Sequence, residues 1–155
     1  MEAALKTFFS SSRFAVVGAS SDTAKFGHKV FVWYLQHNLP VTPINPRVPE
    51  VSVKSSNYVT VASPNNLSSP GDTSLSIITP PAATMKVLQE AKDAGVPAVW
   101  LQPGSYNDEV MAFARKEFDA AIGGTEGGTS GDEGWCVLVD GEDGLKLAGR
   151  EWSKL

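Results

Sequence analysis

The feature that most constrains the fold is a short apolar run that ends at a glycine and precedes a helical pattern. Phe14 to Val17 form a run that suits a strand covered on both faces of a parallel sheet, and Gly18 ends it. From about Gly27, apolar residues recur at the i, i+3 and i+4 spacing of a helix with one buried face. The sequence therefore predicts a strand, a loop and a helix N-terminus, which together present main-chain N–H groups to an anion.

The predicted loop differs from the glycine-rich turn that binds NAD. That turn uses three glycines, for the tight bend, for close approach of the pyrophosphate and for helix–strand packing. Here Ser20 and Thr23 stand at the second and third glycine positions, and the next glycine is Gly27. The hydroxyls of Ser20 and Ser21 and the ammonium group of Lys25 suit a phosphate. A plain strand-to-helix turn without a ligand is the alternative interpretation.

Length and charge narrow the classes of protein and partner. A chain of 155 residues fits one domain. Thirteen basic and 17 acidic residues give a net charge of −4, and without a basic run we expect no nucleic-acid partner. No apolar run approaches the ~20 residues of a membrane span, and Met1 to Phe9 lack a signal-peptide core. The single cysteine, Cys136, excludes an internal disulfide, so we expect a cytoplasmic protein.

The second predicted strand, Val41 to Ile44, ends in a distinctive tripeptide, Asn45, Pro46 and Arg47. In NAD-binding βαβ units, this strand end carries a carboxylate that binds the ribose hydroxyls. An amide and a guanidinium favour a ribose with an additional phosphate, because arginine binds phosphate through two hydrogen bonds. NADP and coenzyme A (CoA) both carry such a phosphate.

The remaining chain continues the alternation of strands and helices. We expect a leading helix within residues 2–12 and strands over 73–79 and 96–101. We also expect a helix that ends at Gly95 and another that is capped by Asn107. The fold class is therefore α/β: a Rossmann-like, doubly wound, mainly parallel sheet with helices on both faces. Ligands bind such sheets at the carboxyl ends of the strands, so the loops after the first, second and central strands should form one crevice.

The other segments give weaker expectations. Residues 58–61 suit an edge strand and 63–67 a helical turn. The run 123–134 holds acidic residues but no cation, and it is expected to be a flexible loop rather than a second phosphate loop. The last part of the single domain, 135–155, is expected to form a strand over 135–139, a turn over 140–144 and a tail that folds back.

Four motifs together resemble those of the small stand-alone CoA-binding proteins, whose domain also forms the N-terminal part of the succinyl-CoA synthetase α subunit. They are Val16-Val-Gly-Ala-Ser20 with Gly27-His-Lys-Val30, Pro43-Ile-Asn-Pro-Arg47, Ser76-Ile-Ile-Thr-Pro-Pro81 and Val99-Trp-Leu-Gln-Pro-Gly104. The resemblance covers about residues 10 to 118. It fails near the C-terminus, where the family has an Arg-Cys pair and this chain has Trp135-Cys136.

The resemblance implies a ligand, CoA or acyl-CoA, with NADP less favoured, and it implies roles for particular residues. The diphosphate would be wrapped by Gly18, Ala19, Ser20 and Ser21, with Gly27 at the helix start. The adenosine and its 3′-phosphate would lie near Asn45, Pro46 and Arg47. The adenine or the start of the pantetheine arm would be bordered by Thr79, Pro80 and Pro81. Charge and loop position add Lys25 to this set.

Other chemistry-bearing residues favour structural roles. His28 is expected to be a surface residue at a helix end, with a phosphate contact as its alternative, and His37 is expected to be structural. Neither has metal-ligand spacing, so no metal site is expected. Cys136 suits a small buried residue. Its alternative is a mixed disulfide with a thiol-bearing ligand. Trp33 and Trp100 suit the core.

Three functions remain open from the sequence. The leading hypothesis is a module that binds CoA or acyl-CoA without catalysis, since no nucleophile–base pair is evident and the family's phosphorylated histidine lies in a second domain. The second is an NADP-dependent reductase or nucleotide-binding sensor. The third is an interaction module without a ligand. A homodimer or a partner enzyme is compatible with each.

Overall fold

The sheet at the centre of the molecule has five parallel strands, in the order β2-β1-β5-β6-β7. The computed structural model describes residues 1–154. Its strands are β1 (Arg13–Val17), β2 (Val41–Ile44), β5 (Thr73–Ile77), β6 (Ala98–Leu101) and β7 (Ala120–Ile122). The central strands β5 and β6 are buried along their whole length because both faces of the sheet are covered, and β5 buries Thr73, Ser74 and Ser76 besides its apolar residues.

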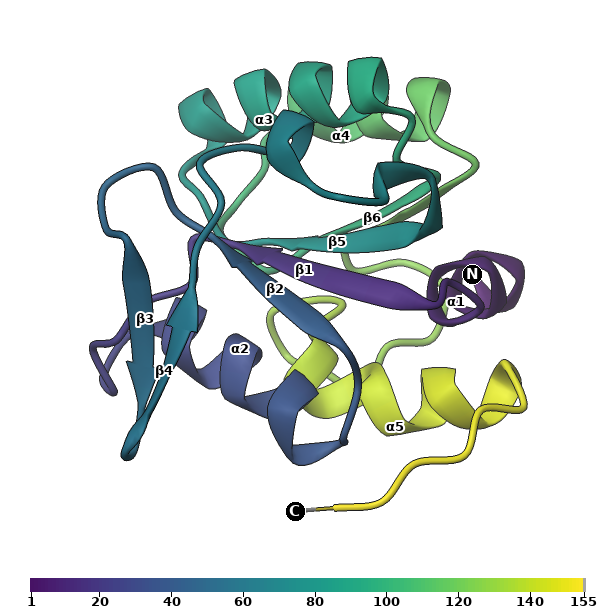
Figure 1. Cartoon of the computed structure of the whole chain (residues 1–155). Helices are drawn as coiled ribbons and strands as arrows, with labels where there is room; N and C mark the ends of the chain where they lie inside the picture. Colours follow the sequence, from purple (N-terminus) through teal and green to yellow (C-terminus); the bar gives the residue numbers. More distant parts are fainter. Residues whose placement is uncertain (155) are drawn as a thin grey trace.

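Helices cover both faces of this sheet (Figure 1). One face carries α1 (Glu2–Phe9), α2 (Phe26–Gln36) and α5 (Val137–Leu147); the other carries α3 (Pro81–Ala94), α4 (Asp108–Glu117) and the short 3₁₀ turns η1 (Pro64–Asn66) and η2 (Pro70–Asp72). A hydrophobic cluster fills each face: Phe8, Phe9, Phe14 and Trp100 lie on the first, and Leu75, Leu88 and Leu101 on the second. The predicted Rossmann-like α/β fold is therefore confirmed.

Most of the expected elements are present at or near their predicted bounds. The leading helix packs Leu5, Phe8 and Phe9 into the core, as its spacing predicts. The left-handed Gly95 ends α3, and the Asn107 side chain accepts a hydrogen bond from the Val110 N–H at the start of α4. Trp33 and Trp100 are both buried, as expected.

The edge strand expected over 58–61 is replaced by a hairpin and a single bridge. β3 (Glu50–Val53) pairs antiparallel with β4 (Ser56–Val59), and Val61 then forms one parallel bridge with Ile44. Figure 1 shows the hairpin beside the carboxyl ends of β1 and β2. The helical turn expected over 63–67 is confirmed as η1.

The expectation of a strand over 135–139 and a turn over 140–144 is wrong. The segment forms α5 instead, and Gly141 and Gly144 lie within it on one face. A Cβ atom on Gly141 would lie 2.3 Å from the Trp33 ring, and one on Gly144 would lie 2.5 Å from the Phe9 ring. These glycines let α5 approach α2 and α1 closely, so here they serve helix packing rather than chain reversal.

The tail after α5 folds back on the domain, as the sequence predicts. The Arg150 guanidinium donates to the main-chain carbonyls of Phe9 and Ser11 and lies 5.1 Å from the centre of the Phe14 ring. Burial lowers the pKa of this guanidinium. No helix among residues 1–154 has the length and apolar composition that a bilayer crossing requires.

Replacing Gly144 with alanine tests this packing. Alanine is the better helix former by about 1 kcal/mol, yet its methyl group would overlap the fully buried Phe9 ring. Overpacking costs about 1–3 kcal/mol, and the close approach to the buried Phe9 ring favours the upper part of that range, so Gly144→Ala should lower the unfolding free energy by up to about 2 kcal/mol in urea denaturation. The neighbouring Asp143→Ala, at an exposed helical position, is the control. A Gly144→Ala protein as stable as this control would contradict the packing argument.

A buried histidine joins α2 to α5. The ring of His37, 3% exposed, donates through Nδ1 to the Trp33 carbonyl at 2.7 Å and pairs through Nε2 with a Glu142 carboxylate oxygen at 2.7 Å. Lys154 also contacts that oxygen, at 3.0 Å. The hydrogen bond from His37, followed by that from Lys154, lowers the pKa of Glu142 from its ordinary 4.5. The structural role expected for His37 is thus confirmed.

The Glu142→Gln substitution should make the unfolding free energy less dependent on pH in the acid range. A carboxyl with a lowered folded-state pKa adds stability above its unfolded pKa and loses that contribution as pH falls through the folded value. Because Glu142 is partly exposed, the variant should lose no more than about 1 kcal/mol at neutral pH. Its difference from the natural protein should begin to shrink as pH falls below the unfolded value of about 4.3 and should vanish once pH is below the lowered folded-state pKa. Thermal unfolding across pH measures this, with Asp143→Asn as control, and a difference that persists in acid would refute it.

Candidate functional site

Three loops meet at the carboxyl edge of the sheet, after β1, β5 and β2. The Gly18 N–H donates to the Ile44 carbonyl at 3.1 Å, and the Ile78 N–H donates to the Val17 carbonyl at 2.9 Å. The Asn45 side chain donates to the Ala19 carbonyl at 3.0 Å. The predicted convergence of these loops is therefore present in the structure.

Two glycines make the junction between β1 and α2 possible. Gly18 adopts a φ of +94°, and a Cβ atom there would lie 3.0 Å from the Ile78 carbonyl oxygen. A Cβ atom on Gly27 would lie only 2.0 Å from the Gly18 carbonyl oxygen. Gly27 thus supplies the close helix–strand packing of an NAD-type turn, although it lies further along the chain.

The loop leaves main-chain donors and a helix N-terminus free. Within residues 1–154, the N–H groups of Ala19, Ser20 and Ser21 have no hydrogen-bond partner. No side chain caps the first turn of α2, whose N-cap residue is Lys25. Free amides and the positive end of a helix dipole together form an environment that stabilises an anion.

Other contacts fix the shape of the loop. Asp22 forms two hydrogen bonds within the loop. Its N–H donates to Ser20 Oγ at 3.1 Å, and its carboxylate accepts from the Ala24 N–H at 3.0 Å. The Ser21 hydroxyl accepts from the Ser52 N–H at 2.8 Å, which ties the loop to the β3–β4 hairpin. The contribution of Ser52 could not be predicted from local sequence patterns.

His28 is buried, and the expectation of a surface residue is wrong. Only 9% of it is exposed, and its Nδ1 lies 2.8 Å from the Ser20 carbonyl. Since a carbonyl only accepts, Nδ1 carries the proton and donates it. The ring points inward because His28 lies in the first turn of α2, from which it can reach the loop that precedes the helix. His28 therefore holds the loop in place.

The residues after β2 are arranged around an Asn turn. The Asn45 side-chain oxygen accepts from the Arg47 N–H at 2.9 Å. Pro46 and Arg47 are exposed, as is Lys25 on the neighbouring loop. Neither the Lys25 nor the Arg47 side chain forms an ion pair within residues 1–154. Two exposed cationic residues thus lie on the loops after β1 and β2.

The residues after β5 make internal contacts. The Thr79 hydroxyl lies 2.8 Å from that of Thr84, which also reaches the Thr79 and Pro80 carbonyls at 3.0 and 3.1 Å. Pro81 is the first residue of α3, where a missing N–H has no cost. The Thr79 side chain is therefore used at the start of α3, whereas Pro80 is exposed and Pro81 is half-buried.

A cavity of about 470 Å³ lies at the same edge, beyond the first residue of α2. Its walls come from α2, the segment after β6 and the loop before α5, and they comprise Phe26, Pro103, Gly131, Asp132, Glu133, Gly134, Cys136 and Val139. Cys136 is buried, as expected, and burial raises the pKa of its thiol. The sequence did not assign these residues to one cavity, because they come from three separate segments.

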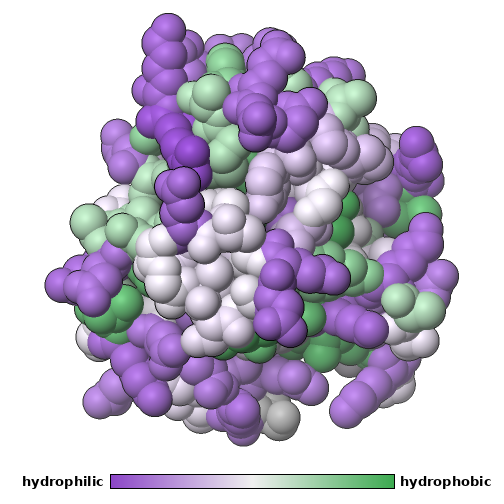
Figure 2. Space-filling view, turned by 180° about the vertical axis from the view of Figure 1, so that it is seen from behind, coloured by the Kyte–Doolittle hydropathy of each residue, from purple (hydrophilic) through white to green (hydrophobic). Residues whose placement is uncertain are grey.

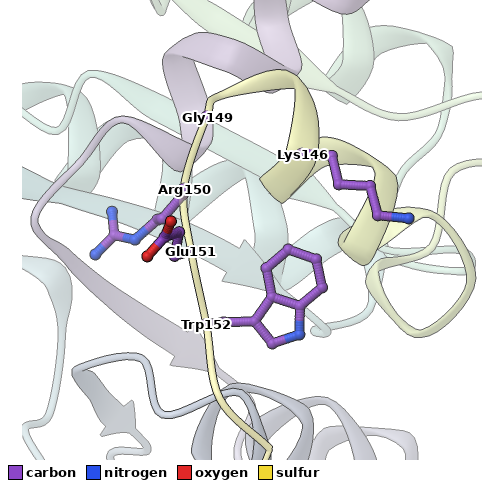
Figure 3. Close-up of a pocket in the computed structure, with 5 residues that line it drawn as sticks. All are labelled: Lys146, Gly149, Arg150, Glu151 and Trp152. Carbon is purple, nitrogen blue, oxygen red and sulfur yellow. The ribbon is translucent and has the colours of Figure 1, made fainter.

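A second hollow, of about 520 Å³, lies by the C-terminal tail. Figure 3 shows its lining residues, with the Arg150 guanidinium turned away from the Trp152 indole. That guanidinium already donates to the Phe9 and Ser11 carbonyls. Since Ser11 precedes β1, this hollow is at the amino edge of the sheet and is separate from the converging loops. No group of three or more metal-ligating side chains occurs within residues 1–154.

Gly27→Ala should disturb the junction between β1 and α2. The added methyl group would collide with a main-chain oxygen, which cannot move without shifting the loop. We expect a loss of about 1–3 kcal/mol in the unfolding free energy, measured by chemical denaturation. Gly71→Ala is the control, since a Cβ atom there would meet nothing within 4 Å and its φ is not positive. Equal stability of the two variants would contradict the proposed role of Gly27.

The chain matches the family described as "CoA binding domain" over residues 12–125. A conserved hypothetical protein from Pyrococcus furiosus is 29% identical, with a TM-score of 0.62 over 70% of this chain and 90% of its own. A Thermus thermophilus protein is 27% identical, with a TM-score of 0.65 over 79% of this chain and 90% of its own. A hypothetical protein from Pyrococcus horikoshii shares the fold, at 22% identity and a TM-score of 0.68, over 79% and 83%. No curated protein matches the chain.

Proposed function

The chain belongs to the CoA-binding domain family, and from that premise we propose that it binds CoA or an acyl-CoA at the carboxyl edge of its sheet. The observation that carries the proposal is the loop after β1, where three consecutive amides are free and the first turn of α2 has no cap. A diphosphate would satisfy these donors. Gly18, Ala19, Ser20 and Ser21 would surround it, and Lys25 would balance part of its charge.

The loop after β2 would hold the adenosine 3′-phosphate. The Asn45 side chain bonds to both adjoining segments, the Ala19 carbonyl and the Arg47 N–H. Asn45 would therefore fix the Arg47 main chain beside the phosphate loop, and the free guanidinium would bind the phosphate through two hydrogen bonds. Pro46 would support this turn, and Pro80 and Pro81 would border the adenine or the pantetheine arm.

We propose binding without catalysis. The side chains around the crevice supply positive charge and hydrogen bonds, but they do not form a nucleophile–base pair. The nearest thiol, on Cys136, has a pKa raised by burial, which keeps it protonated and poorly nucleophilic. The same property disfavours spontaneous exchange with a disulfide of CoA. Gly27 and His28 would contribute by shaping the loop.

Binding of CoA, dephospho-CoA and NADP should separate the candidate functions. CoA at 100 times its dissociation constant stabilises a protein by about 2.7 kcal/mol, which corresponds to a rise of about 5–10 °C in the melting temperature. Dephospho-CoA should bind more weakly, because it lacks the group assigned to Arg47. A response to NADP alone would replace this proposal with a reductase or sensor, and no response to any of the three would refute it.

The Arg47→Ala variant should weaken CoA binding about tenfold, which is about 1.4 kcal/mol. It should leave dephospho-CoA affinity unchanged, since that ligand has no 3′-phosphate. Isothermal titration calorimetry measures both. Arg13→Ala is the matched control, because Arg13 is an exposed arginine at the amino end of β1, away from the crevice. Equal losses for both ligands would exclude the 3′-phosphate as the partner of Arg47.

A further inference from the structure

The cavity beside α2 is not used by the proposed nucleotide site. Its walls begin at Phe26, which directly follows Lys25 at the end of the phosphate loop, and continue through Pro103 after β6. Gly131 to Gly134 and Val139 close the other side. A chain that leaves the diphosphate and runs along the sheet edge toward β6 would reach this cavity.

Buried hydrogen bonds hold the loop that forms the far wall. The Asp140 carboxylate, 3% exposed, accepts from the Thr129 hydroxyl at 2.7 Å, the Ser130 N–H at 3.0 Å and the Cys136 N–H at 3.1 Å. The Gln102 side chain, after β6, accepts from the Val137 N–H at 3.0 Å. The buried Asp140 and Gln102 side chains thus fix the loop before α5, and α5 itself, to the sheet. The cavity therefore has a defined wall.

The lining of the cavity combines apolar walls with negative charge. Phe26, Pro103 and Val139 supply apolar surface, and 51% of Val139 is exposed. Figure 2 shows that, on the face it presents, hydrophobic residues appear as separate patches among hydrophilic ones. Among the described residues that line the cavity, the charged ones are Asp132 and Glu133, both acidic.

We propose that this cavity receives the acyl end of an acyl-CoA and selects uncharged, apolar acyl groups over those that end in a carboxylate. This inference rests on the proposed function. Apolar walls favour a hydrocarbon chain by about 0.8 kcal/mol for each buried methylene group. The Asp132 and Glu133 carboxylates repel a second negative charge. The cations and the free amides lie toward β1 and β2, so the phosphates bind at that side and the thioester points toward β6.

Butyryl-CoA and succinyl-CoA test this selectivity as a matched pair, because both acyl groups have four carbons and differ in a terminal methyl or carboxylate. Calorimetry at low ionic strength should give roughly tenfold weaker binding of succinyl-CoA. The difference should shrink in about 1 M salt, where the Debye length falls to ~3 Å. Equal affinities at low salt, with CoA itself bound, would overturn the cavity assignment and leave the proposed function standing.

The double variant Asp132→Asn/Glu133→Gln should remove most of the discrimination while leaving the affinity for butyryl-CoA within about twofold. The double variant Glu90→Gln/Asp93→Asn is its control: it removes the same charge from α3, near that helix's C-terminus, and should keep the discrimination. If both double variants discriminate equally, Asp132 and Glu133 do not select the acyl group.

Cys136 gives a readout inside the cavity at alkaline pH, where a thiol with a raised pKa ionises and can react. It is the only cysteine of the chain, so one alkylation by iodoacetamide reports on this position alone by mass. Saturating butyryl-CoA, which has no free thiol, should slow that alkylation at least fivefold. Unchanged alkylation with butyryl-CoA bound would place the acyl group elsewhere. Failure of CoA and butyryl-CoA to bind at all would instead refute the proposed function.

Discussion

The carboxyl edge of the sheet depends on one close main-chain contact, between Gly27 at the start of α2 and Gly18 at the end of β1. Any side chain at residue 27 would overlap the Gly18 carbonyl. Because α2 starts so near β1, the unsatisfied N–H groups of its first turn lie next to the loop that follows β1. The positive φ of Gly18 then turns the chain under the Ile78 carbonyl. The result is a loop of free main-chain amides among residues 1–154, held in place by the side chains of Asp22, His28 and Asn45.

A buried polar chain ties this edge to the C-terminal helix. The Tyr34 hydroxyl on α2 lies 2.6 Å from Ser76 Oγ on β5, and Gln102 donates to the same Ser76 oxygen at 3.3 Å while accepting from the Val137 N–H. Burial raises the pKa of Tyr34, so the phenol stays neutral and can donate. Each member would be costly to leave unpaired, since buried polar groups without a partner are strongly destabilising. The network therefore fixes α2, β5, β6 and α5 in one arrangement and places the cavity wall next to the phosphate loop.

The elements that local pattern determines could be predicted from the sequence. The apolar strands, the Asn107 cap and the Gly95 terminus need only neighbours in the chain. The errors arise where tertiary contacts decide the outcome. Gly141 and Gly144 suggest a turn, but Trp33 and Phe9 require that they lie in a helix without Cβ atoms. His28 and Ser52 reach Ser20 and Ser21 through contacts that no local spacing encodes. The three loops of the candidate site could be predicted because parallel strands bring their carboxyl ends together; the cavity could not, because its wall depends on the buried Asp140.

The charges at the carboxyl edge are separated along the strand order, and this separation would give the proposed acyl-CoA ligand one direction. Lys25 and Arg47 follow β1 and β2, whereas Asp132 and Glu133 lie in the segment between β7 and α5. A ligand with phosphates at one end and an uncharged acyl group at the other matches this polarity in one orientation only. Reversing it would bring phosphates to carboxylates and leave the amides of the β1 loop unsatisfied. The same strand order that makes β5 and β6 the buried centre of the sheet would therefore also separate the two ends of the proposed ligand, so that its binding specificity would follow from the topology as much as from any single side chain.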